Sequence, residues 1–211
     1  MATALGEVLG FAVPAVVGLN LLWLFGEVDS AGRAVTFYPL VLLAGMGEGA
    51  VLGTAQWVVL HRVLPSLTAH AWVGATAIAA GGAWALGLLP SSVDAAVTLP
   101  PEAQAGAWVV IAPVLLCSIG VAQWIVLPHH LDGAGRWIPA NVIAWLLGLP
   151  VTFIVPALVP DDSPPTVWIA AFVGAGLLMG AIVGAVTGRT LVRLLATHTV
   201  QPTYASRSRD L

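Results

Sequence analysis

The feature that most constrains this chain is a series of six long apolar stretches that are almost free of charge. A helix needs roughly 20 consecutive, largely apolar residues to cross the hydrocarbon core of a bilayer. Six segments meet this requirement: Val8–Phe25, Phe37–Leu60, Ala71–Leu89, Ala105–Leu127, Trp137–Val159 and Val167–Gly188. None contains an arginine, and only one contains an acid, which is Glu48. We therefore predict an all-α integral membrane protein, a six-helix bundle that forms a single transmembrane domain over residues 1–211.

The composition agrees with a location in lipid. The chain is 59% hydrophobic and 8% charged, whereas soluble domains carry about 25% charged residues because a surface in water needs them. This composition excludes an ordinary soluble enzyme and a disordered tail. Seven arginines and no lysine exclude a nucleic-acid binder, which needs a basic footprint. The single cysteine, Cys117, excludes a disulfide framework and a cysteine-based zinc site.

The arginines are distributed along the chain in a way that orients the spans. Six of the seven lie in alternate loops and in the C-terminal segment: Arg62, Arg136, Arg189, Arg193, Arg207 and Arg209. The other three loops hold Arg33 and six acids: Glu27, Asp29, Asp94, Glu102, Asp161 and Asp162. Because cytoplasmic loops carry an excess of basic residues, this asymmetry predicts a multi-pass protein of the cell membrane with both termini in the cytoplasm. We expect Val8–Phe25 to be a retained helix and not a secretory signal, since no basic residue precedes it.

Tryptophan gives an independent indication of where the spans end. The amphipathic indole ring prefers the headgroup level of a bilayer. Four tryptophans fall at the predicted cytoplasmic ends, Trp57, Trp72, Trp124 and Trp137, and four at or near the outer ends, Trp23, Trp84, Trp108 and Trp168. We interpret these eight as two interfacial belts. Trp145 alone lies well inside a span.

A short motif recurs along the chain. Gly53–Leu60 reads GTAQWVVL, and Gly120–Leu127 reads GVAQWIVL. A third, degraded copy, Gly184–Leu191, reads GAVTGRTL. Downstream of the first two copies, Trp72–Ile78 matches Trp137–Ile143. Because the copies occupy the second, fourth and sixth spans, the repeating unit is a helical hairpin, and three parallel hairpins predict a bundle with pseudo-threefold symmetry.

These segments resemble small, uncharacterised bacterial polytopic membrane proteins that carry repeated Gly-x-x-Gln-Trp-x-x-Leu hairpins, each motif being followed by a helix that begins with tryptophan. The resemblance covers about residues 45–150 and, more faintly, the third copy. The chain departs from the pattern where Gly188 replaces the tryptophan and where the basic loop reads Pro128-His129-His130. The resemblance implies a helical fold and a membrane location, and it implies no activity.

Small and polar residues are placed where helices are expected to pack. Glycines four residues apart form stripes on the second and sixth spans: Gly45, Gly49 and Gly53, and Gly176, Gly180 and Gly184. Such stripes let helix backbones approach closely in lipid. Five polar residues lie at a similar depth, near the cytoplasmic third: Gln56, Gln123, Thr76, Asn141 and Thr187. We favour interhelical hydrogen bonding, on the order of 1 kcal/mol per contact, as their role; the alternative is a polar ring that lines a site or pore.

Glu48 is the exception among the span residues. It lies near the middle of its span, where a charge costs at least ~2.5 kcal/mol. Neither other copy of the repeat has an acid there, since the aligned residues are Leu115 and Met179. An acid without a counterpart in a repeated scaffold indicates a candidate proton- or cation-coupled site. The alternative is a neutral carboxylic acid bonded to a backbone carbonyl or to Asn20 or Asn141.

The remaining candidates for chemistry lie outside the spans. All five histidines fall on the predicted cytoplasmic side: His61, His70, His129, His130 and His198. With Asp132 nearby, a surface metal site is the alternative, but the spacing matches no metal motif, so we expect solvated interfacial histidines and no bound metal. The sequence has no phosphate-binding, serine-hydrolase, metalloprotease or heme-attachment motif, so no catalytic residue and no cofactor are predicted.

These observations favour a non-enzymatic polytopic membrane protein that binds or passes a small solute or ion, an expectation that rests on the repeat and on Glu48. The alternative is a non-catalytic assembly or interaction subunit of a membrane complex that binds lipid or pigment between its helices, which nine tryptophans and short loops suit equally well. A membrane enzyme that uses the cytoplasmic histidines and Asp132 is a third and weaker option. The expected partners are the lipid bilayer and another protein or a second copy of the chain, with no nucleic acid.

Overall fold

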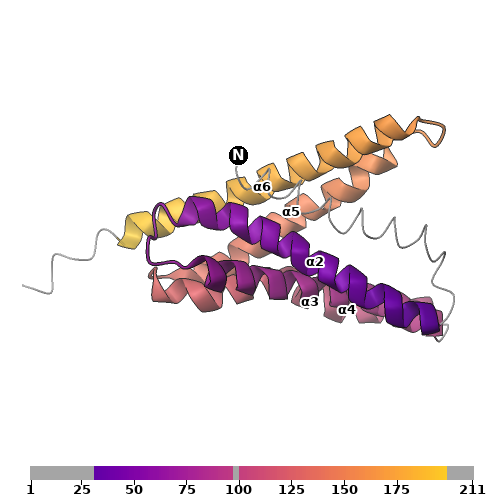
Figure 1. Ribbon diagram of the computed structural model, residues 1–211, viewed down its shortest axis with the longest axis horizontal. Coiled ribbons are helices and arrows are strands. Elements are labelled where there is room, and N and C mark those ends of the chain that lie inside the picture. Colours follow the sequence, from indigo (N-terminus) through magenta and orange to yellow (C-terminus); the bar gives the residue numbers. More distant parts are fainter. Residues whose placement is uncertain (1–30, 97–99, 199–211) are drawn as a thin grey trace, which may run out of the picture.

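The computed structural model describes residues 31–96 and 100–198, and over these residues it is helical, with no strand (Figure 1). The long helices are α2 (Ala31–Leu60), α3 (Ala69–Ala96), α4 (Pro101–Val126), α5 (Trp137–Ala157) and α6 (Pro165–His198). Two short 3-10 helices, η1 (Leu127–His129) and η2 (Ala134–Arg136), connect α4 to α5. The all-α prediction is therefore confirmed for the described residues, and the predicted span Val8–Phe25 lies outside them.

Each of the five long helices is long and apolar enough to cross a membrane. Many of their large apolar side chains point away from the rest of the molecule, as at Val109, which is 75% exposed, and Phe153, which is 69% exposed. Extended apolar surfaces of this kind are unfavourable in water and suit hydrocarbon. The described part of the chain is therefore compatible with a protein embedded in a membrane.

Four helices extend beyond the spans expected from hydropathy, the first being α2, which begins at Ala31, before the expected Phe37. α3 continues to Ala96, past the expected end at Leu89, and α6 continues to His198, past Gly188. α4 begins earlier than expected, at Pro101, because the fixed φ angle of proline suits the first turn of a helix, where no backbone N–H is needed. Length and hydropathy therefore located these helices, whereas local helix signals decide where they begin and end.

The extension of α6 is amphipathic, unlike the rest of that helix. Leu191 and Leu194 are buried, whereas Arg189 and Arg193 are exposed. The expected span stops at Gly188 because the next residue is charged. The helix continues because its leucines still find a core on one face while the arginines stay in contact with solvent on the other.

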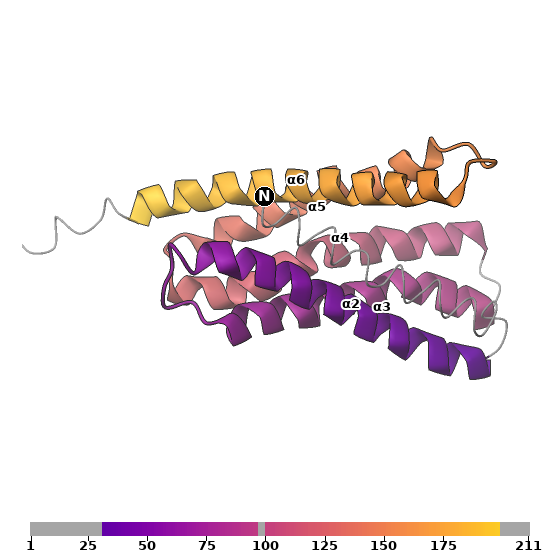
Figure 2. The same cartoon turned by 45° about the horizontal axis from the view of Figure 1, so that its top comes forward.

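The helices pack in chain order, α2 against α3, α3 against α4, α4 against α5 and α5 against α6. The short connections after α2 and α5 make antiparallel pairs of α2 with α3 and of α5 with α6. Figures 1 and 2 show that two groups, the α5–α6 pair and the three helices α2, α3 and α4, come together at one end of the molecule. Toward the end where α2 and α6 begin, the two groups separate.

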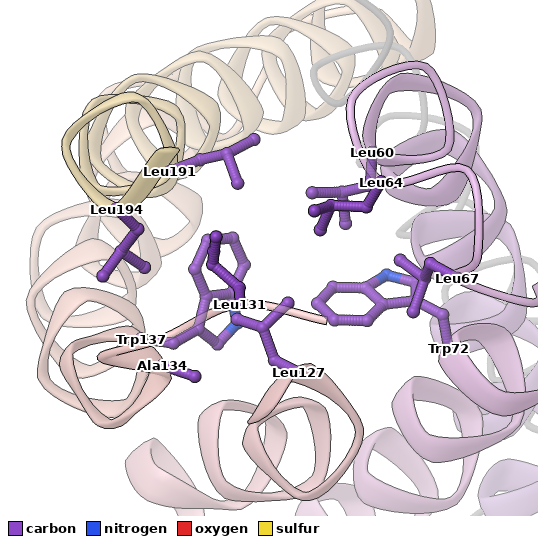
Figure 3. Packing of buried hydrophobic residues seen from close by; sticks show 10 residues of the cluster. All are labelled: Leu60, Leu64, Leu67, Trp72, Leu127, Leu131, Ala134, Trp137, Leu191 and Leu194. Carbon is purple, nitrogen blue, oxygen red and sulfur yellow. The ribbon is translucent and has the colours of Figure 1, made fainter. Parts of the chain in front are cut away.

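A hydrophobic cluster closes the end where the two groups meet (Figure 3). We call it the end cluster; its buried members are Leu60, Leu64, Leu67, Trp72, Leu127, Leu131, Ala134, Trp137, Leu191 and Leu194. They come from the end of α2 and its following loop, the start of α3, the η1–η2 connection, the start of α5 and the end of α6. At Gly133 the connection needs a left-handed turn, φ 70°, which glycine adopts without strain. The segments predicted to be cytoplasmic thus lie together at a single end.

Candidate functional site

Six polar and aromatic side chains from four helices meet next to the end cluster, which shares Trp72 and Trp137 with them. We call them the Gln–Trp cluster; they are Gln56 on α2, Trp72 and Thr76 on α3, Gln123 on α4, and Trp137 and Asn141 on α5. All six are buried, and Gln56, with 6% of its surface exposed, is the most accessible of them. Polar groups at this depth need hydrogen-bond partners, because water does not supply them.

Gln123 lies at the centre of the hydrogen bonds within the Gln–Trp cluster. Its amide nitrogen, Nε2, donates to Gln56 Oε1 at 2.7 Å and to Thr76 Oγ1 at 3.0 Å. Its amide oxygen, Oε1, accepts the indole N–H of Trp137 at 2.8 Å. Through this one side chain, α4 is joined to α2, α3 and α5. Trp72 completes the group by donating its indole N–H to Gln56 Oε1 at 3.3 Å.

Corresponding residues of the two clear motif copies make corresponding contacts. Trp72 donates to Gln56, and Trp137 donates to Gln123. The residue four positions after each tryptophan bonds back to that tryptophan's carbonyl oxygen, Thr76 at 2.8 Å and Asn141 at 3.0 Å. The two indole rings also meet edge to face, with centroids 5.9 Å apart. The α2–α3 and α4–α5 junctions therefore use the same chemistry.

The glycine of each of the two clear motif copies lies against the helix that carries this tryptophan. A Cβ atom built on Gly53 would lie 3.0 Å from Thr76 Cβ and 3.1 Å from Val73 Cα. One built on Gly120 would lie 2.9 Å from Asn141 Cβ and 3.3 Å from Ile138 Cα. A larger residue at either position would push the two helices apart.

The rest of the predicted glycine stripe on α2 also faces α3. A Cβ atom on Gly49 would lie 2.8 Å from the carbonyl oxygen of Thr76, and one on Gly45 would overlap the indole of Trp84. On α6, Gly176 and Gly180 are buried and Gly184 is half-buried. The stripe on α2 is therefore a surface of close helix–helix approach.

Thr187 does not join the Gln–Trp cluster, although the sequence predicts it at a similar depth to the polar residues of that cluster. Its hydroxyl donates to the carbonyl oxygen of Val183 in its own helix at 2.7 Å. Within the described residues, two buried side-chain polar atoms have no hydrogen-bond partner, Oδ1 of Asn141 and Nε1 of Trp145, which lies one turn further along α5. The structure thus bonds Gln56, Thr76 and Gln123 directly to one another, attaches Asn141 through the carbonyl oxygen of Trp137, and leaves an acceptor and a donor open on α5.

Glu48 is buried, with 8% of its surface exposed, and its partner is a tryptophan. Its Oε2 atom accepts the indole N–H of Trp84 on α3 at 2.8 Å. Asn141, one of the expected partners, donates its amide to the carbonyl oxygen of Trp137 instead, and Asn20 lies outside the described residues. Among the described residues no arginine or histidine forms an ion pair with this carboxyl.

The interpretation of tryptophan as a belt residue missed three members of these sites. Trp72 and Trp137 are 0% and 3% exposed, and Trp84 is half-buried against α2. The repeat contained a signal for the first two, because each begins a matched segment that follows a motif glutamine, by 16 residues at Trp72 and by 14 at Trp137. For Trp84 the only signal was indirect: the carboxyl of Glu48, in an apolar span, needs a hydrogen-bond donor.

The histidines lie at the same end as the end cluster, apart from His198, whose side chain is outside the described part. His130 Nδ1 lies 2.8 Å from Ser66 Oγ, and the ring of His61 stacks on Trp57 with centroids 4.9 Å apart. Among the described residues no three His, Cys, Asp or Glu side chains are placed to hold a metal ion.

Comparison of the chain with protein-family models, with curated proteins and with solved structures finds no match. The function must therefore be argued from the geometry of the Gln–Trp cluster and of Glu48.

Proposed function

We propose that this chain is a non-enzymatic polytopic membrane protein that binds or passes a small cation or a polar, protonatable solute at Glu48. The observation that carries the proposal is the environment of the Glu48 carboxyl. It is buried between apolar helices and bonded to the indole N–H of Trp84, and no basic side chain of the described residues is paired with it.

A carboxylate inside a membrane needs a compensating charge, because its desolvation is costly. An indole N–H donates a hydrogen bond and carries no net charge, so Trp84 orients the carboxyl without neutralising it. The compensating charge then has to come from a proton, a cation or a cationic group of a solute. Exchange of that partner would couple Glu48 to whatever crosses or enters the bundle.

The Gln–Trp cluster has a different role in this proposal, that of a clamp between helices. Its amide and indole groups bond to one another and therefore do not present an open polar surface to a solute. The open Oδ1 atom of Asn141 is the exception. With the open Nε1 of Trp145, one turn further along α5, it provides one acceptor and one donor for a water molecule or a small polar group.

We also propose the complete arrangement of the chain, a six-helix bundle of three hairpins with pseudo-threefold symmetry and both termini in the cytoplasm of a bacterial cell. The matched contacts of Gly53 and Gly120 support it, because they relate α2–α3 to α4–α5. Threefold symmetry then requires the segment Val8–Phe25 to lie against α6 as α3 lies against α2. A cysteine scan of that segment against Gly184→Cys, in a chain carrying Cys117→Ser, tests this, since disulfides form only between neighbouring helices.

The decisive experiment for the function compares Glu48→Gln with Glu48→Asp in proteoliposomes. Uptake of protons, Na⁺ and K⁺ is measured with ion-sensitive dyes enclosed in the vesicles. We expect Glu48→Gln to abolish the flux of the coupled ion and Glu48→Asp to retain part of it. Glu102→Gln, which removes an exposed acid from the first turn of α4, is the matched control and leaves the flux unchanged.

Equal fluxes of all three ions in the wild-type chain and in Glu48→Gln would contradict the proposal. The second candidate function, an assembly subunit that binds lipid or pigment, would then take its place. It is favoured by the internal pairing of the Gln–Trp cluster and by half-exposed indoles on the outer surface, such as Trp108 at 42%. Purification in mild detergent separates the two, because a stoichiometric protein or coloured partner supports the subunit and a single monodisperse chain argues against it.

A further inference from the structure

A pocket opens between α5 and α6 beside the end cluster, outside the sites described above. Its volume is about 340 Å³. Arg136, at the last position of η2, and Arg193, near the end of α6, contribute its charged edge. Pro139 and Ile143 on α5 form an apolar wall, and Thr190 lies on the opposite side. The pocket therefore combines two cations from different helices with an apolar surface.

The two arginines are available to a ligand. Both side chains are exposed, and among the described residues no carboxylate forms an ion pair with either guanidinium. Thr190 uses its hydroxyl hydrogen within α6, where it donates to the carbonyl oxygen of Val186 at 3.2 Å. The charged donors at the pocket are thus the guanidinium groups, whose planar arrays of N–H groups match the oxygens of a phosphate.

The apolar wall does not end at the pocket. Ile143 is 50% exposed, and Leu146 and Leu147, about one turn further along α5, are 53% and 55% exposed. These side chains belong to the part of α5 that is apolar enough to cross a membrane. The pocket is consequently charged at its outer edge and continuous with a hydrocarbon-facing surface on its inner side.

We propose that this pocket binds an anionic phospholipid, with the headgroup phosphate between Arg136 and Arg193 and an acyl chain along Ile143. A phospholipid has the same order of groups, an anionic head at the interface and a hydrocarbon chain toward the membrane interior. Basic pockets between helices at the cytoplasmic face commonly hold such headgroups. The site does not depend on Glu48, so it can hold lipid whether or not the chain transports anything.

The test measures lipid binding by native mass spectrometry of the full chain in neutral detergent. The probes are phosphatidylglycerol, phosphatidylcholine with matched acyl chains, and glycerol 3-phosphate as a headgroup without chains. We expect phosphatidylglycerol to bind best. Arg136→Gln with Arg193→Gln weakens its binding roughly 30-fold, which corresponds to about 1 kcal/mol for each arginine. Phosphatidylcholine binding changes by less than about twofold, because its headgroup has no net charge.

The matched control is Arg62→Gln with Arg189→Gln, which removes the same charge from the same end of the molecule without touching the pocket. This control retains phosphatidylglycerol binding. The proposal is overturned if both double variants lose binding equally, because the effect is then one of overall charge. It is also overturned if glycerol 3-phosphate binds as tightly as the lipid, since that result identifies a site for soluble phosphates. A further variant, Ile143→Asn, is expected to weaken lipid binding while leaving glycerol 3-phosphate unaffected.

Discussion

The Gln–Trp cluster and the Glu48–Trp84 pair both place a polar side chain of α2 against an indole N–H of α3, yet they differ in what surrounds the acceptor. Gln56 Oε1 accepts from Trp72 and also from Gln123, which is bonded in turn to Thr76 and Trp137. Among the residues that the structure describes, Glu48 Oε2 accepts from Trp84 alone.

The two sites also differ in how they relate to the repeat. The indole-to-glutamine bond occurs twice, once in each clear copy of the motif. The acid Glu48 occurs once, because the aligned residues of the other two copies are Leu115 and Met179. Groups that recur and satisfy one another hold helices together. A titratable group that breaks the repeat and has one neutral partner remains able to interact with something else.

The largest expected effect on stability comes from a change in the Gln–Trp cluster. Gln123→Leu removes three interhelical hydrogen bonds and leaves the Trp137 N–H without its acceptor. We expect the free energy of unfolding to fall by roughly 2 to 3 kcal/mol, since such bonds average about 0.6 kcal/mol in membranes and a buried unpaired donor adds to the loss. The measurement is a titration with SDS from mild detergent micelles. Thr54→Val, which removes an exposed hydroxyl bonded within its own helix, serves as the control and changes the value by less than about 0.5 kcal/mol.

The second prediction is that the α2–α3 and α4–α5 junctions, which match in geometry, also contribute similarly to the free energy of unfolding. Gly53→Val and Gly120→Val each force side-chain atoms into a neighbouring helix, so each should lower the free energy of unfolding by about 1 to 3 kcal/mol, and by similar amounts. Gly106→Val on α4 is the control, because a Cβ atom there meets nothing within 4 Å. A large loss at one motif glycine and none at the other would show that the two junctions are not equivalent.

The sequence was sufficient to predict the helical class, the positions of α2 to α6, and Gln56, Thr76, Gln123 and Asn141 as polar residues at helix contacts. Long apolar stretches and a motif in register depend on local chain properties, which a single sequence displays. It was not sufficient to predict the partner of Glu48, because Trp84 is 36 residues away and the pairing depends on how α2 lies against α3.

The same limit explains why the hydrogen bonds of Trp72 and Trp137 were not predicted. Hydropathy places both residues near the end of a span, where an indole faces either lipid headgroups or a neighbouring helix. Whether the indole faces lipid or a helix depends on where a hydrogen-bond acceptor lies. Only the packed structure shows Gln56 and Gln123 next to the two indole nitrogens.

A third prediction concerns the stability of the Glu48–Trp84 pair. Glu48→Gln keeps an oxygen that can accept the Trp84 N–H, so the free energy of unfolding should change by less than about 1 kcal/mol. Trp84→Phe removes the donor and should lower the stability by about 1 kcal/mol. Both values come from the same SDS titration. If Glu48→Gln were as destabilising as Gln123→Leu, Glu48 would belong with the structural groups and the contrast between the two sites would disappear.

The smallest expected effect is a gain, at the place where the third copy of the motif departs from the other two. In the α3–α4 hairpin, Gln123 donates to Thr76; the aligned residues in the α5–α6 hairpin are Thr187 and Asn141. Gly148 faces Met179 and Val183, so in this antiparallel pair Asn141, two turns earlier on α5, lies at the level of Thr187 on α6.

Thr187→Gln would therefore place an amide donor near the open Oδ1 atom of Asn141. We expect an increase of up to about 1 kcal/mol in the free energy of unfolding, the value of one satisfied buried bond. Thr190→Gln, nearly one turn away on the same helix and half-buried, controls for the longer side chain and should give no gain. A gain at position 187 that disappears when Asn141 is replaced by leucine would show that the third hairpin retains the geometry of the other two and has lost only the glutamine. A loss of stability at 187 would mean instead that α6 has moved away from the repeat, and the pseudo-threefold arrangement would have to be abandoned there.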